Sequence, residues 1–194
     1  MQTEEFTELD QAKREKVFIA AKELFSRFGF RKTTVDEIAD WAGISKRTMY
    51  EVFSSKEEIL AELVMFEALT FRRHCKKQIK NLDDMVDELR TFCVLWRDYF
   101  NENKFLGQVL TDEKGMFSPF LKNEINLVET GMKEMISRLL VEGMEKGAFR
   151  PLDLTSTVEC VFILLHRFTL EAAEPQNPES SIDWISFIIN AVKA

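Results

Sequence analysis

Residues 17–56 read VFIAAKELFSRFGFRKTTVDEIADWAGISKRTMYEVFSSK, and this stretch decides the fold. Its first apolar residues recur at the spacing of one α-helical stripe and are Val17, Ala20, Ala21, Leu24, Phe25 and Phe28. Gly29 follows directly, and glycine is favoured in the left-handed conformation that ends many helices. The pattern therefore predicts a helix that ends at Phe28.

Two short helices are predicted next. Thr34 can cap the first of them with Glu37 as its capping-box partner, and Gly43 ends it. Ser45 can cap the second, whose candidate inward residues are Met49, Tyr50 and Phe53. Both helices are therefore bounded by local signals.

A long fourth helix begins after a further predicted capping box, formed by Ser55 and Glu58. Two short helices joined by a tight glycine turn, with a helix on each side, form a helix-turn-helix unit. A plain helical bundle can also contain short helices. However, three caps and two glycine stops agree over about thirty residues, which favours the helix-turn-helix interpretation.

The composition favours an all-α protein. The chain has 194 residues, of which 45% are hydrophobic, but only 7 glycines and 4 prolines, whereas β-rich folds need many turn residues. We expect a helix-turn-helix domain over residues 1–56 and a larger helical domain over 57–194. Within the second domain, the apolar pattern predicts helices from Met85 to Phe100 and from Ser118 toward Gly147 after a break near 112–115. Two more are predicted at about 154–173 and 182–192.

Several protein classes are disfavoured by the sequence. No uncharged apolar run approaches the roughly 18 residues of a membrane span, and the first residues lack the basic and apolar segments of a secretory signal. The odd number of cysteines, Cys75, Cys93 and Cys160, argues against a disulfide framework and indicates reduced, mostly buried thiols. We therefore expect a cytoplasmic protein without a membrane partner.

The sequence carries no signature of an enzyme. It contains no Gly-rich phosphate loop, CxxC pair or spaced set of metal ligands, and no nucleophile–base pair or carboxylate dyad. The two histidines have no clustered partners. We expect no cofactor, no metal and no catalytic activity.

The motifs TTVDEIA (33–39), WAGIS (41–45) and MYEVF (49–53) resemble the DNA-binding domain of the TetR family of transcriptional regulators. The resemblance covers roughly residues 15–60 almost without gaps, whereas the rest of the chain is similar only in length and helical character. Val52 departs from the pattern, because the family often has histidine or another polar residue there. This departure puts one DNA contact common in relatives in doubt.

The resemblance implies an all-α fold with an N-terminal three-helix DNA-binding domain and a C-terminal helical domain for ligand binding and dimerisation. It also implies that the third helix enters the major groove, where Lys46 or Arg47 can reach guanine, while Thr34, Tyr50 and Lys56 contact the DNA backbone. The expected DNA-binding residues are Thr33, Thr34, Ser45, Lys46, Arg47, Thr48, Tyr50 and Lys56. The alternatives are a core aromatic role for Tyr50 and a solvated face for Lys46 and Arg47.

The charge distribution is compatible with a DNA partner. The chain as a whole carries −7, but the window Ser26–Lys56 holds six basic and four acidic side chains. Specific sites usually bind about 4–10 kcal/mol more tightly than random DNA, a range that two half-sites reach more readily than one. We therefore expect a homodimer on a double-stranded, inverted-repeat operator.

Phenylalanine is abundant, with 17 residues, and aromatic residues and methionines are concentrated in the second domain. Residues that could line an apolar ligand pocket are Phe92, Trp96, Tyr99, Phe100, Met132, Met135, Phe162 and His166. An ordinary packed core is the alternative, and the pocket is expected chiefly because the family has one. The implied effector is an apolar or aromatic small molecule that releases a repressor from DNA. A movement of the fourth helix is expected to transmit the effect of the ligand to the DNA-binding domain.

The last two predicted helices carry more apolar surface than a terminal pair needs, and related proteins dimerise through such a pair. The expected interface residues are Val161, Leu165, Phe168, Trp184, Phe187, Ile188 and Ala191. The main functional alternative is a helical protein that binds a small molecule or a partner without recognising DNA. Val52 gives that alternative slight support, whereas the basic residues of the third helix oppose it.

Overall fold

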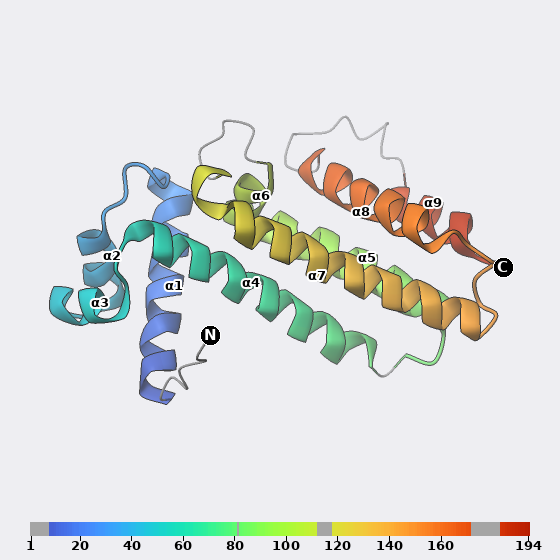
Figure 1. Cartoon of the computed structure of the whole chain (residues 1–194), viewed down its shortest axis with the longest axis horizontal. Helices are drawn as coiled ribbons and strands as arrows, with labels where there is room; N and C mark the ends of the chain where they lie inside the picture. The colour runs from blue at the N-terminus through green and yellow to red at the C-terminus, as the bar shows by residue number, and fades with distance from the viewer. Residues whose placement is uncertain (1–7, 81, 112–117, 172–182) are drawn as a thin grey trace. The chain divides into compact units, whose positions relative to one another are not determined.

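The computed structural model describes residues 8–80, 82–111, 118–171 and 183–194. All regular secondary structure in these ranges is α-helical, which confirms the predicted fold class (Figure 1). Contacts divide the chain into Met1–Glu67, called unit 1, and Ala68–Ala194, called unit 2. The domain boundary predicted after residue 56 lies before the observed division after Glu67, because unit 1 also includes the first turns of the fourth helix.

Unit 1 contains α1 (Glu8–Phe28), α2 (Val35–Ala42), α3 (Lys46–Val52) and the start of α4 (Lys56–Ile79). The predicted stripe of α1 is buried except for Phe28, which is exposed. Gly29 and Gly43 have φ of 81° and 67°, so both predicted helix stops are confirmed. These two residues set where α1 and α2 end.

The predicted caps are confirmed at all three helix starts, but only one of the two predicted capping boxes is complete. Thr34 and Glu37 form a reciprocal capping box, and Ser45 accepts a hydrogen bond from the Thr48 N–H. At the third start, Ser55 accepts from the Glu58 N–H, but the Glu58 carboxylate accepts from the N–H and hydroxyl of Ser54. These bonds with Ser54 lower the pKa of Glu58. The predicted reciprocal bond is therefore displaced by one residue.

The described part of unit 2 contains the rest of α4 and five further helices: α5 (Met85–Glu102), α6 (Lys104–Thr111), α7 (Ser118–Glu145), α8 (Leu154–Glu171) and α9 (Trp184–Val192). α5 contacts each of the other four and is the central helix of this group. Its buried residues are Met85, Leu89, Phe92, Cys93, Trp96 and Phe100. The remaining helices pack around this apolar face.

Helix α6 was not predicted separately. It follows α5 directly, because the backbone leaves the helical conformation at the buried Asn103, with φ of −107° and ψ of 71°. The predicted break near 112–115 and the predicted helix ends at Ala173 and Ile182 lie outside the described residues.

Two of the three thiols are buried as predicted, and the third is not. Burial raises the pKa of Cys75 and of Cys93 to about 12, so that both remain protonated at neutral pH. Cys160 is exposed on α8, so that the thiols are mostly buried, as expected. None of the described helices has the length and apolar character to cross a bilayer, and the described part of the chain contains no group of side chains suited to a metal.

The turn after α7 holds the end of α9. The N–H groups of Ala148 and Phe149 both donate to the Gly143 carbonyl, at 2.9 and 3.1 Å. One residue later, the Arg150 N–H donates to the Val192 carbonyl at 3.0 Å. The Phe149 ring is buried, and a Cβ atom placed on Gly143 would lie 2.0 Å from it. Glycine is therefore required at position 143 for this close approach.

We predict that Gly143→Ala lowers the free energy of unfolding by about 1–3 kcal/mol, because the buried Phe149 ring must move. Gly107→Ala is the matched control, since a Cβ atom there meets no atom within 4 Å. This control should leave stability unchanged or raise it by up to about 1 kcal/mol, through helix propensity. Urea titrations followed by circular dichroism compare the two, and equal stabilities would contradict the close approach.

Candidate nucleic-acid interface

Helix α3 has one buried face and one exposed face. Met49 and the following Phe53 are fully buried, as predicted, and hold the helix against the rest of unit 1. Tyr50 is 57% exposed, so that its predicted inward position is wrong and the ring is available on the outer face. The other exposed residues are Ser45, Lys46, Arg47 and Glu51, whereas Thr48 is half-buried.

The two hydroxyl groups at the start of α3 are bonded to each other. The Ser45 and Thr48 oxygens lie 2.9 Å apart, and Ser45 Oγ also accepts from the Thr48 N–H at 3.0 Å. This cap fixes the first turn of the helix. Both hydroxyls therefore have defined positions before any ligand binds.

Each basic side chain of α3 is paired with a carboxylate of unit 1. Lys46 Nζ lies 2.5 Å from Asp36 Oδ2 on α2, and Arg47 Nε lies 2.9 Å from Glu51 Oε1 one turn along α3. These hydrogen bonds raise the pKa of both basic groups. The Arg47 side chain is 89% exposed, so that solvent and any DNA can reach it.

The residues just before α2 have different accessibilities. Thr34 is exposed, and both its N–H and its hydroxyl donate to Glu37 at 2.8 Å, which lowers the pKa of that carboxyl. Thr33 is only 2% exposed, and its hydroxyl donates to the Gly29 carbonyl at 3.0 Å. The Thr33 side chain is therefore part of the core rather than of the outer surface.

Lys56 has an internal role that the sequence did not indicate. Its ammonium donates to the carbonyl oxygens of Phe30 and Thr33, both at 2.8 Å, and lies 4.5 Å from the centroid of the Phe30 ring. These contacts join the start of α4 to the loop between α1 and α2. Because the Lys56 ammonium already donates to two carbonyl oxygens, a DNA phosphate would have to share this ammonium with them.

Arg14 on α1 was missed as a residue that supports α3. Its guanidinium donates to the Val52 carbonyl at 3.4 Å, pairs with Glu62 and lies 4.9 Å from the centroid of the Phe53 ring. A cation at the carbonyl end of a helix complements the helix dipole. The contact joins residues 38 positions apart, so that no local pattern could have identified it.

An aromatic pair is exposed on unit 1 at the end of α1 and on α2. Phe28 and Trp41 are each 55% exposed, and the Arg27 guanidinium lies 5.9 Å from the centroid of the indole ring. Together with Leu24 and nearby charged residues, they line an open pocket of about 600 Å³. The sequence analysis did not identify this pocket.

In unit 2, the structure brings six of the eight predicted ligand residues together. The central ring is Trp96, with ring centroids 6.1 Å from Phe92, 4.9 Å from Phe100 and 6.1 Å from Phe162. Tyr99 contacts Phe100, and His166 contacts Phe162. The remaining two, Met132 and Met135, are buried on α7.

Phe71 on α4 is the residue of this cluster that the sequence analysis missed. Its ring contacts Phe92, Trp96, Tyr99 and Phe100, with centroids between 4.9 and 6.3 Å apart. Within the described part of the chain, no group accepts a hydrogen bond from the buried Trp96 indole N–H. The cluster is therefore apolar with one unpaired donor.

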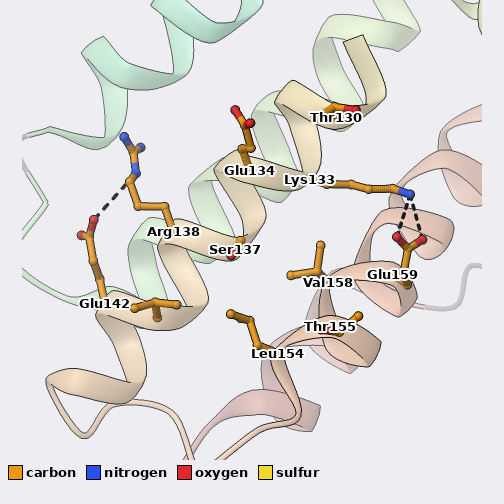
Figure 2. A pocket seen from close by; sticks show the side chains of 11 residues that line it. Thr130, Lys133, Glu134, Ser137, Arg138, Glu142, Leu154, Thr155, Val158 and Glu159 are labelled. Carbon is orange, nitrogen blue, oxygen red and sulfur yellow. Dashed lines mark hydrogen bonds and ion pairs between the residues drawn. The ribbon is translucent and has the colours of Figure 1, made fainter. Parts of the chain in front are cut away.

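An open pocket of about 640 Å³ lies between α7 and α8 (Figure 2). Lys133 of α7 reaches across it and bonds both oxygens of Glu159 on α8, at 2.7 and 2.9 Å. None of the eight predicted ligand residues lines this pocket. Its lining residues are Thr130, Lys133, Glu134, Ser137, Arg138, Val141, Glu142, Leu154, Thr155, Val158 and Glu159.

The predicted interface residues of α8 and α9 are divided between the core and the surface. Those buried within unit 2 are Val161, Leu165, Trp184 and Ile188. The half-buried Phe168 stacks on Trp184, with ring centroids 6.0 Å apart. Phe187 is 61% exposed and Ala191 is exposed, and Ile163, which was not predicted, is 59% exposed. These last three are exposed apolar residues in the described part of α8 and α9, where a second molecule can reach them.

Comparisons with known proteins support the helix-turn-helix interpretation. Residues 19–63 match the model of the family described as bacterial regulatory proteins, tetR family. The HTH-type transcriptional repressor KstR2 of Mycolicibacterium smegmatis is 31% identical over 72% of this chain and 69% of its own length. The HTH-type transcriptional repressor NicS of Pseudomonas putida is 25% identical over 90% of this chain and 88% of its own length.

The fold is also similar to that of a solved regulator. The crystal structure of FadR from Bacillus subtilis in complex with stearoyl-CoA has a TM-score of 0.71 to this chain, at 19% identity, and covers 91% of this chain and 94% of its own. The similarity therefore extends through both units and shows a shared architecture.

We predict that Lys56→Ala lowers the free energy of unfolding by about 1–3 kcal/mol, because the Phe30 and Thr33 carbonyls lose a charged donor. Lys32→Ala, in the same loop and exposed, should change stability by less than about 0.5 kcal/mol. Thermal unfolding of both variants checks this expectation. Loss of DNA binding by the Lys56 variant at unchanged stability would instead identify a pure phosphate contact.

Proposed function

Because the chain belongs to the TetR family of bacterial transcriptional regulators, we propose that it represses transcription as a dimer on an inverted-repeat operator. We further propose that an apolar or aromatic small molecule releases it from DNA. The relatives named above are regulators rather than enzymes, and two of them are repressors.

The outer face of α3 is the observation that carries the DNA-binding proposal. Within a single turn this face presents the hydroxyl of Ser45, the ammonium of Lys46 and the guanidinium of Arg47. Met49 and Phe53 hold the opposite face in the core. A helix anchored in this way can enter a major groove without reorganisation. The Arg47 guanidinium has the fork geometry that pairs with O6 and N7 of guanine, and the exposed Tyr50 hydroxyl can donate to a phosphate.

The aromatic cluster around Trp96 supports an apolar effector. A ligand that displaced part of this packing would meet aromatic rings, with the Trp96 indole N–H as a donor for one polar atom. The similar FadR structure holds stearoyl-CoA, a ligand with a long apolar chain. Helix α4 contributes residues to both units, so that a ligand-dependent shift of this helix would link the aromatic cluster to the DNA-binding helices. Coupling of about 1–3 kcal/mol changes operator affinity by roughly 5–150-fold.

Exposed apolar residues on α8 and α9 support the dimer. Ile163 and Phe187 are large side chains with more than half of their surface in contact with solvent. Two-fold pairing of this surface would bury them and would present two copies of α3 to two half-sites.

We predict that Arg47→Ala relaxes sequence preference at one base pair of each half-site by about 1–3 kcal/mol, because the bidentate contact with guanine is lost. Selection of binding sites from a random duplex library, carried out with the original protein and with the variant, measures this preference. Arg73→Ala is the control, since Arg73 is an exposed arginine of α4 in unit 2 and its loss should leave the selected sequence unchanged. Failure of the original protein to bind duplex DNA at low ionic strength would overturn the proposed function.

We predict that Phe187→Asp weakens the dimer by about 30-fold or more, because an interfacial aromatic residue contributes about 2 kcal/mol or more. Leu127→Asp is the matched control, since Leu127 is equally exposed at 61% but lies on α7. Analytical ultracentrifugation across micromolar concentrations gives the dissociation constants. A stable monomer for the unaltered chain, or equal losses in both variants, would contradict an interface on α8 and α9.

A further inference from the structure

The Arg47–Glu51 pair has a geometry that bears on how α3 reads DNA. The contact uses Arg47 Nε, which donates to Glu51 Oε1 at 2.9 Å, and so does not occupy the two terminal NH₂ groups. Bidentate recognition of guanine O6 and N7 needs two donors of a fixed fork. An arginine held through Nε can therefore present both terminal groups to a base while its carboxylate partner stays in place.

The ion pairs Lys46–Asp36 and Arg47–Glu51 also remove net charge from the outer face of α3. Lys46 and Arg47 are the two cations, and Asp36 and Glu51 lie within 2.9 Å of them, so that the four charges sum to zero. Binding to random DNA depends on cations that neutralise phosphates and release counterions. A carboxylate next to each cation already neutralises that cation, and it repels the phosphates of the DNA backbone.

We propose that Glu51 is a positioning and specificity-determining residue that orients the Arg47 guanidinium toward guanine and lowers the affinity of the surface for random DNA. This inference rests on the proposed function and extends it. Exposed ion pairs contribute little to stability, and both side chains of this pair are more than half exposed. The pair therefore adds little to folding stability, and we expect its effect to lie in DNA binding.

Two substitutions separate the positioning role of Glu51 from its charge. Glu51→Gln removes the charge but keeps an oxygen that can accept from Arg47 Nε. Glu51→Ala removes both. Glu142→Gln is the control, because Glu142 forms the corresponding i, i+4 pair with Arg138 on α7 of unit 2 and its change adds the same net charge (Figure 2).

We expect both Glu51 variants to bind random-sequence duplex about threefold or more tightly at low salt, because a charge near the phosphates is lost. The slope of log K against log salt should steepen by up to about 0.9, the effect of one additional phosphate contact. The Glu142 variant should match the original protein in both measurements. Fluorescence anisotropy with a labelled random duplex provides these values.

Site selection from a random library then tests the positioning role. The Gln variant should keep the guanine preference assigned to Arg47, whereas the Ala variant should lose about tenfold or more of it. Unchanged salt slopes in both Glu51 variants, or an equal change in the Glu142 variant, would overturn the role in random binding. Equal guanine preference in the Gln and Ala variants would overturn the positioning role. Absence of any DNA binding by the original protein would overturn the proposed function, and this inference with it.

Discussion

The shortness of α2 and α3 is the constraint on which the rest of unit 1 depends. They contain eight and seven residues, whereas isolated helices shorter than about 12–15 residues are marginal in water. Their stability must therefore come from packing and from caps. Burial of Ile38, Met49 and Phe53 supplies the packing, and Thr34 and Ser45 supply the caps. The direction in which every outer side chain of α3 extends follows from these few contacts.

Local chemistry allowed much of unit 1 to be predicted from its sequence. Glycine at a left-handed position and a hydroxyl residue ahead of a helix act within a few residues, so that Gly29, Gly43 and Ser45 could be assigned correctly. Contacts between distant residues left no comparable signal. Arg14 with Val52, and Lys56 with the α1–α2 loop, depend on the tertiary arrangement and were found only in the structure.

Periodicity was less informative for unit 2, because it shows that a helix face is apolar but not what covers that face. Leu165 and Ile188 were predicted to be interface residues, as was Phe187, yet the first two are buried within unit 2 and the third is exposed. For the same reason, aromatic spacing predicted most members of the cluster around Trp96 but could not distinguish a ligand site from a packed core. Phe71 was missed because it lies on a helix assigned to another role.

The two hydrogen bonds from Lys56 have a mechanical consequence for the DNA-binding helices. They fix the first residue of α4 to the loop that ends at the N-cap of α2. A rotation of the first turn of α4 must either stretch both bonds or carry that loop with it. As long as both bonds hold, a twist of the first turn of α4 is passed to the start of α2 through this loop.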